Sequence, residues 1–212
     1  FQAKSGGGSG YRDLSKIDHI PVVYNIKWLG LGPIKIMFWN IQGTSSREWF
    51  WAEEKMRCVI EIVHGHKPDL VYFSEVSNKL IPDFLGENYK LLGSSYELDK
   101  NKELGTKDLR CYGYFDGNLA EYLIEKKVEM GKTRLERSGD VRAWLTTKLL
   151  YKDYVLEITG LHARASKDGG KSNIAHIINS KINKPSRNTS YIFGGDFNLG
   201  LGESYDWGYR ET

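Results

Sequence analysis

The chain has 212 residues, which suits one ordinary domain or two small ones with a buried core. Hydrophobic residues make up 40% and charged residues 27%, a composition that excludes an intrinsically disordered chain. The net charge of +3 permits a polyanionic partner but is too small for a basic nucleic-acid-binding tail. No apolar run approaches the length of a membrane span and no signal peptide opens the chain, so we expect no membrane span.

The first part of the chain predicts strands around one long helix. Residues 1–16 are polar and glycine-rich, which is typical of a flexible loop or linker. β-Branched and aromatic runs predict strands, and apolar residues at helical spacing predict a helix. In chain order the predictions are a strand at 17–29, a break at 30–33, a strand at 34–40, a helix at 48–66 and a strand at 70–75. Pro21 indicates that it lies among the first residues of its strand or that this strand is at the edge of a sheet.

The second part predicts hairpins and then a further strand–helix–strand unit. In chain order the predictions are a loop-rich stretch at 77–107, strands at 109–115 and 120–128, an exposed turn at 129–140, a hairpin of 141–151 with 154–163, a loop at 166–172, a helix at 173–182, a strand at 191–198 and a loop-like tail at 199–212. Strand–helix–strand units on either side of hairpins indicate a mixed α/β sandwich.

Cys58 and Cys111 are the two cysteines. Two buried free thiols are the expected state, with a disulfide or a shared metal as the alternatives. His64 and His66 flank the end of the predicted helix, where a histidine satisfied by the helix terminus is expected in preference to a metal site.

Several predicted strands end in residues suited to phosphate chemistry. Carboxylates and carboxamides without cysteine ligands suit Mg²⁺, Mn²⁺ or Ca²⁺ better than zinc. Histidines beside such a cation suit phosphoryl transfer, because an imidazole and the metal together neutralise the phosphate while a carboxylate orients the attacking water. The strand-end residues are Asp18, His19, Asn40, Glu75, His162, Asp196 and Asn198.

These motifs resemble those of the endonuclease/exonuclease/phosphatase superfamily, which has the DNase I-like fold. FWN at 38–40, SE at 74–75, HARAS at 162–166, GDFN at 195–198 and DHIPV at 18–22 carry the resemblance. Within the superfamily, the chain is most similar to the catalytic B subunit of cytolethal distending toxin. The resemblance implies a four-layer α/β (α+β) sandwich, in which two packed mixed β-sheets are flanked by helices.

The resemblance also implies roles for individual residues. Glu75 would bind the metal, Mg²⁺ or else Mn²⁺ or Ca²⁺, with Asn40 and Asp18 assisting. Asp196 would activate the water, His162 would contact the scissile phosphate, and His19, oriented by Asp18, would stabilise the transition state. The residues implied to bind the substrate phosphate are Asn198, Asn40, Arg142 and Arg164, of which the two arginines could equally be ordinary surface residues.

The motif order departs from that of the family, in which the DHxPV strand closes the chain. Here it precedes FWN, so we expect one circularly permuted domain, 1–212. Residues 1–29 would be the family's C-terminal segment, 30–33 the joining linker, and 34–212 the family's N-terminal and central part. The alternative is that 1–33 are an unrelated extension. Lys16-Ile17-Asp18 also resembles the strand before the DH motif, and in that alignment His19 is not the catalytic histidine.

The expected function is metal-dependent phosphodiester hydrolysis by a DNA endonuclease of the toxin type. DNA or another phosphate ester would be the substrate, toxin delivery subunits would be possible partners, and secretion would follow from the resemblance alone. Two alternatives are a phosphoinositide or other phosphomonoester phosphatase on the same fold, and a catalytically impaired binding module.

Overall fold

The computed structural model describes residues 19–41, 49–76, 79–101, 110–122, 127–134, 141–163, 167–182 and 187–198. In chain order the elements are β1 (Val22–Trp28), β2 (Leu31–Asn40), α1 (Trp49–His66), β3 (Leu70–Ser74), β4 (Tyr89–Ser94), α2 (Tyr96–Lys100), β5 (Tyr112–Asp116), the 3₁₀ helix η3 (Gly117–Tyr122), β6 (Lys127–Arg134), β7 (Val141–Tyr151), β8 (Tyr154–His162), α3 (Lys167–Ile182) and β9 (Thr189–Asp196).

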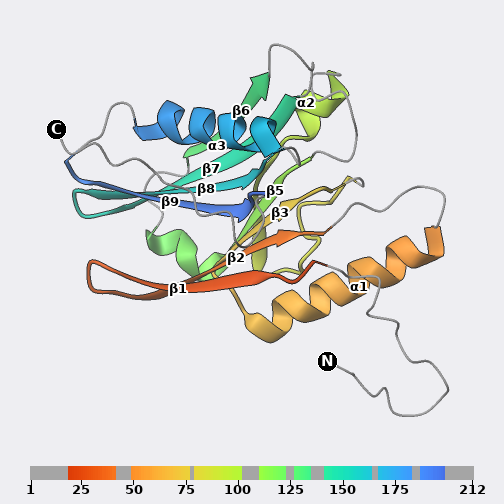
Figure 1. The fold of residues 1–212 in the computed structure, drawn as a ribbon. Helices are drawn as coiled ribbons and strands as arrows, with labels where there is room; N and C mark the ends of the chain where they lie inside the picture. Colours follow the sequence, from red (N-terminus) through yellow and green to blue (C-terminus); the bar gives the residue numbers. More distant parts are fainter. Residues whose placement is uncertain are drawn as a thin grey trace.

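The described strands form two sheets. One has five strands in the order β1-β2-β3-β5-β4, and the other has four in the order β6-β7-β8-β9. Each sheet contains one parallel pair, β2 with β3 and β8 with β9, and its other pairs are antiparallel. The helix α1 covers the outer face of the first sheet and α3 that of the second (Figure 1). The four-layer sandwich predicted from the sequence is therefore confirmed.

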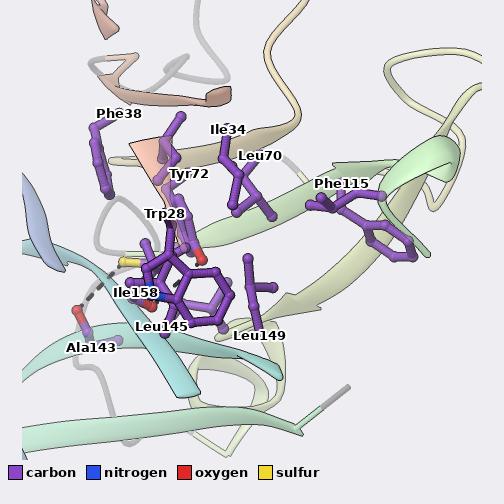
Figure 2. Close-up of a cluster of buried hydrophobic side chains, with 14 residues drawn as sticks. Trp28, Ile34, Phe38, Leu70, Tyr72, Phe115, Ala143, Leu145, Leu149 and Ile158 are labelled. Atoms are coloured by element: carbon purple, nitrogen blue, oxygen red, sulfur yellow. Dashed lines mark hydrogen bonds between the residues drawn. The ribbon is translucent and has the colours of Figure 1, made fainter. Parts of the chain in front are cut away.

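Strand β2 shows why two sheets and a helix pack around it. Ile34, Ile36 and Phe38 point into the core between the sheets, where they meet residues of β3, β7 and β8 (Figure 2). Met37 and Trp39 point the other way, into the cluster that α1 covers. Because successive side chains of a strand alternate between its faces, a strand that is apolar on both faces has to be covered on both. The predicted alternation of 34–40 is confirmed.

Glycines let the two sheets approach closely. A Cβ atom at Gly160 of β8 would lie 2.6 Å from Cδ1 of Tyr72 on β3, inside the van der Waals contact distance. We expect Gly160→Ala to lower the free energy of unfolding by about 1–3 kcal/mol, because Cβ of Tyr72 would also lie 2.8 Å from the new methyl group and a rotamer change does not move that atom. Chemical denaturation measures this, with Gly65→Ala in α1 as the matched control, since nothing lies within 4 Å of that Cβ position. Equal midpoints for the two variants would contradict this packing.

Strand β6 corrects two sequence-based predictions. A strand was expected at 120–128, but the chain forms η3 up to Tyr122, and the strand begins at Lys127. The exposed turn expected at 129–140 is also wrong in its first part, because Lys127–Arg134 pairs with β7 along its whole length. Strand pairing uses backbone N–H and C=O groups, so a charged run forms an edge strand when the neighbouring strand offers hydrogen-bond partners. Charges on an edge strand also discourage its pairing with other chains.

Three further boundaries differ from the predictions. The stretch at 77–107 contains β4 and α2 in addition to loop. The helix α3 begins at Lys167, within the predicted loop at 166–172, although Gly169 and Gly170 have low helix propensity. The break expected at 30–33 shrinks to a turn at 29–30, since β2 begins at Leu31. Each difference reflects pairing or packing that overrides local propensity.

Both cysteines are buried thiols and neither forms a disulfide, as expected. Burial raises the pKa of the Cys111 thiol to about 12, against a smaller opposing effect of the charge on Arg142. Within the described ranges, none of the helices combines the length and apolar character that crossing a membrane requires.

Candidate active site

The carboxyl ends of the two parallel strand pairs meet across the sandwich. In the first sheet Asn40 pairs with Ser74, the last residue of β3, and Glu75 follows directly. In the second sheet His162 pairs with Asp196, at the ends of β8 and β9. Strands β2 and β3 also lie against β9 and β8. Side chains at the same end of both pairs therefore converge on one place.

Four predicted residues make direct contacts there. Nε2 of His162 lies 3.0 Å from Oε1 of Glu75, and Nδ2 of Asn40 donates a hydrogen bond of 2.7 Å to Oδ2 of Asp196. The Asn40 side chain also hydrogen-bonds Glu75, so it links the two carboxylates. One possible ligand atom from each of Glu75, His162 and Asp196 lies within 4.8 Å of the others.

Glu75 is held in an unusual backbone conformation. Its φ of 54° falls in the left-handed region, which is uncommon for residues other than glycine. Its pKa is lowered, chiefly by the hydrogen bond from His162 and against the effect of partial burial. The charge on His162, the Asn40 hydrogen bond and the charge on His19 lower the pKa further. Glu75 is thus kept ionised and aimed at the other sheet.

His162 is buried, with 4% of its surface exposed, and its Nδ1 has no hydrogen-bond partner in the described part of the chain. A proton on that nitrogen would leave a buried donor unsatisfied, which costs about 1–3 kcal/mol. Nε2, by contrast, faces the Glu75 carboxylate, so an N–H group on this nitrogen has a partner. His162 can offer this N–H group to an oxygen atom in the site.

The residues after β9 lock the Asp196 carboxylate in place. The backbone N–H of Asn198 donates to Oδ1 of Asp196 at 2.8 Å, and the Asn198 side chain donates to the carbonyl of Ala163 at 2.6 Å. Asn198 has a φ of 49°, which asparagine tolerates better than most residues. Together with Asn40, this arrangement gives both oxygens of Asp196 a hydrogen-bond donor.

The second glycine of the motif, Gly195, is required by its backbone conformation and by its close contact with β8. Its φ is 126°, and a Cβ atom there would collide with the carbonyl oxygen of Leu161 on β8. A residue with a side chain fits neither the conformation nor the space. The paired glycines in the sequence were the available signal for this close approach, which sets Asp196 opposite His162.

His19 lies near this site, although it precedes β1. Its carbonyl accepts a 2.8 Å hydrogen bond from the indole N–H of Trp39, the residue before Asn40. It is also close enough to Glu75 for its charge to lower the pKa of that carboxyl. Trp39 was not singled out from the sequence, because an aromatic residue in a strand reads as core. Asp18 lies outside the described residues.

Arg142, one of the two predicted arginines, lies close to the end of β8. Arg142 is half-buried at the start of β7, two residues before Trp144, which pairs with Leu161. The start of β7 thus lies beside the end of β8, the strand that carries His162. Arg164 lies outside the described residues.

The donor set fits a hard divalent cation. Glu75 and Asp196 supply carboxylate oxygens, the ligand type that Mg²⁺ and Ca²⁺ prefer, and neither cysteine lies in the group of Glu75, His162 and Asp196.

No family model matches the chain, and no curated protein does. Solved structures do match. A functionally unknown conserved protein from Enterococcus faecalis has a TM-score of 0.59 at 13% identity, covering 78% of this chain and 67% of that one. A mannosyl-6-phosphatase from Bacteroides thetaiotaomicron has a TM-score of 0.53 at 16% identity, covering 79% and 66%. The human Nocturnin catalytic domain, solved with a bound sulfate anion, has a TM-score of 0.50 at 18% identity, covering 87% and 69%.

TDP2 structures from D. rerio and C. elegans match with TM-scores of 0.47 and 0.48, and the chain spans 62% and 48% of their lengths. At such low identities the likeness is one of fold. The chain shares the α/β sandwich fold of these structures, which is the DNase I-like fold expected from the sequence.

Proposed function

We propose that this chain is a divalent-metal-dependent phosphodiester hydrolase that acts on DNA. The observation that carries the proposal is the convergence of Glu75, His162 and Asp196 from both sheets, with possible ligand atoms within 4.8 Å of one another. Two carboxylates and an imidazole N–H donor at one point supply the parts that hydrolysis of a phosphate ester requires.

The roles proposed for individual residues follow the resemblance, and the contacts of Asp196 and His162 support two of them. Hydrogen bonds hold both carboxylate oxygens of Asp196. Asp196 would accept a proton from the attacking water and would orient that water in line with the leaving oxygen. His162 would donate its Nε2–H to a non-bridging phosphate oxygen, and His19 would stabilise the charge that develops in the transition state. Further contacts to the substrate phosphate would come from Asn40, Asn198, Arg142 and Arg164.

Glu75 would hold the metal, assisted by Asn40 and Asp18, and Mg²⁺ is the proposed ion, with Mn²⁺ or Ca²⁺ as substitutes. A bound cation would act as a Lewis acid on the phosphate. The lowered pKa of Glu75 keeps this carboxylate available for such an ion at neutral pH.

Metal removal tests the proposed function directly. We expect the purified protein to nick supercoiled plasmid in Mg²⁺, to lose that activity in excess EDTA, and to regain it when Mg²⁺ is restored. Agarose gels of relaxed against supercoiled plasmid measure the rate, and the EDTA-treated protein should keep its circular-dichroism spectrum. Nicking that persists unchanged in EDTA, or no hydrolysis of any phosphate ester with Mg²⁺, Mn²⁺ or Ca²⁺, would reject the proposal. The second result would favour a binding module.

The finer proposal is a DNase of the cytolethal-distending-toxin type, with delivery subunits as partners, and it rests on the motifs at 38–48 and 162–166. A phosphoinositide or other phosphomonoesterase is the second candidate, because a mannosyl-6-phosphatase has the same fold. Parallel assays separate the two candidates: release of inorganic phosphate from a phosphoinositide or sugar phosphate against nicking of plasmid.

We also propose that the domain is circularly permuted, with 1–29 as the transplanted closing segment and 30–33 at the junction. Two features of the described residues support this. Strand β1 pairs antiparallel with β2 through a short turn, and the pairing runs from Trp28 with Leu31 to Val22 with Phe38. That register carries the chain before β1 toward the end of β2, where His19 meets Trp39. In an unpermuted chain, the residues on either side of this turn would be the two chain ends, and they are close enough for a short turn to join them.

A further inference from the structure

Trp39 connects the segment before β1 to the interior of the first sheet. Its indole ring is 2% exposed and packs in the cluster that α1 covers, where its centroid lies 6.4 Å from that of the Phe73 ring. Its Nε1–H group donates a 2.8 Å hydrogen bond to the backbone carbonyl of His19. A buried indole N–H needs an acceptor, because burial of a donor without a partner is unfavourable. Packing therefore fixes the ring, and the ring in turn holds the His19 backbone.

The side chains next to His19 give this segment little other support. The backbone ladder between β1 and β2 begins at Val22, three residues after His19. Ile20 is 84% exposed, so its side chain contributes little packing. Pro21 has no backbone N–H to donate. The hydrogen bond from Trp39 is therefore well placed to set where His19 lies.

The end of β2 makes two contacts from adjacent residues. Trp39 and Asn40 point to opposite faces of the sheet, as successive strand residues do. Asn40 donates its 2.7 Å hydrogen bond to Asp196 in the other sheet, whereas Trp39 donates to His19. The charge on His19 also lowers the pKa of Glu75, so the imidazole lies within electrostatic range of the candidate metal ligand. One dipeptide thus fixes His19 and Asp196 relative to each other.

We propose that Trp39 is a positioning residue, which holds the His19 backbone so that the His19 imidazole reaches the substrate phosphate. This inference rests on the proposed function and deepens it, because it adds to the mechanism a residue that does not touch the substrate. Trp39 acts through His19 alone. The effect on rate can be large, since a shift of about 1 Å in a catalytic group can lower a rate roughly 10²-fold.

Two variants remove the Trp39 N–H group. Trp39→Phe keeps an aromatic ring in the cluster, and replacement of the indole by benzothiophene keeps nearly the whole shape with sulfur in place of N–H. We expect each variant to lower kcat for plasmid nicking in Mg²⁺ roughly 10-fold and to leave KM for DNA nearly unchanged, because the lost interaction acts on the transition state. Thermal unfolding curves show whether each variant is folded at the assay temperature. Trp28→Phe is the matched control, since Trp28 is also buried but lies at the other end of β1, and it should nick at the wild-type rate.

A double variant separates positioning from a general loss of stability. If Trp39 acts through His19, the protein with both Trp39→Phe and His19→Ala should nick within about twofold of His19→Ala alone, because the imidazole that Trp39 positions is already absent. Losses that multiply would show that Trp39 acts on another group and would overturn the inference. Wild-type nicking by both Trp39 variants, or by His19→Ala, would also overturn it and leave the hydrolase proposal standing.

Nuclear magnetic resonance provides a measurement that does not need turnover. In protein with isotope-labelled histidine, the benzothiophene variant should shift the Cε1–H resonance of His19, assigned with His19→Ala. It should leave the resonance of His66 unchanged, since that exposed imidazole lies at the end of α1. An unchanged His19 resonance would contradict the positioning role. If the wild-type protein hydrolyses no phosphate ester with any metal, the hydrolase proposal fails, whereas the resonance still decides whether Trp39 positions His19.

Discussion

His162→Ala is expected to lower the rate of metal-dependent phosphodiester hydrolysis roughly 10²- to 10⁴-fold. The substitution removes the Nε2–H donor, which lies 3.0 Å from Glu75 and would contact the phosphate. It also removes the largest cause of the lowered pKa of Glu75, so that carboxyl would titrate closer to its ordinary range. The two effects act together, because a donor to the phosphate and an orienting partner for the metal-binding carboxylate are lost at once.

The measurement is the plasmid-nicking rate, taken with a thermal unfolding curve because His162 is buried. His176→Ala is the matched control, since His176 is exposed on α3, and it should nick at the wild-type rate. His162→Gln keeps an N–H donor and should lose less than His162→Ala. A His162→Ala protein that is folded and nicks within about threefold of the wild type would remove this residue from the mechanism.

His19→Ala is expected to lower the rate by roughly 10²- to 10³-fold, the scale for loss of one donor that stabilises transition-state charge. The substitution keeps the hydrogen bond to Trp39, because the acceptor is the His19 backbone carbonyl. The position of the segment before β1 should therefore persist while the imidazole is lost. A loss of this size would support both the catalytic role and the permuted order.

His66→Ala offers a matched control for that experiment. The His66 backbone carbonyl also accepts a hydrogen bond, from Nζ of Lys35, and its imidazole is exposed at the end of α1, away from the site. Nicking rates of the two variants and of the wild type should be compared at equal enzyme concentration. If the nicking rates of His19→Ala and His66→Ala are equal, His19 has no part in catalysis. That result would favour the alternative alignment, in which residues 16–18 form the strand before the DH motif.

Much of the architecture could be predicted from local sequence. The strand at 34–40 alternates between two apolar faces, which already requires a layer on each side, and that requirement is met. The helix predicted at 48–66 closely matches Trp49–His66. These predictions succeed because the spacing of apolar side chains is a property of the local sequence, and it defines the face of the strand or helix that becomes buried.

Other elements could not be predicted locally. Lys127–Arg134 has the composition of an exposed turn, yet it forms β6 because β7 offers it a complete backbone ladder. Lys167–Gly170 reads as a loop, yet it opens α3, whose later residues Ile174 and Ile177 pack against the second sheet. Non-local pairing and packing decide these segments, so no short window of sequence contains the information.

The residue types at the strand ends were determined by the sequence alone: carboxylates, amides and imidazoles suited to a hard cation and a phosphate. Their assembly was decided only by the tertiary structure, because Asn40 and Asp196 come from different sheets, yet form a 2.7 Å hydrogen bond. The physical reason is the parallel pairing within each sheet, which places two carboxyl ends together, and the close approach of the sheets at Gly160 and Gly194, which brings the two ends face to face.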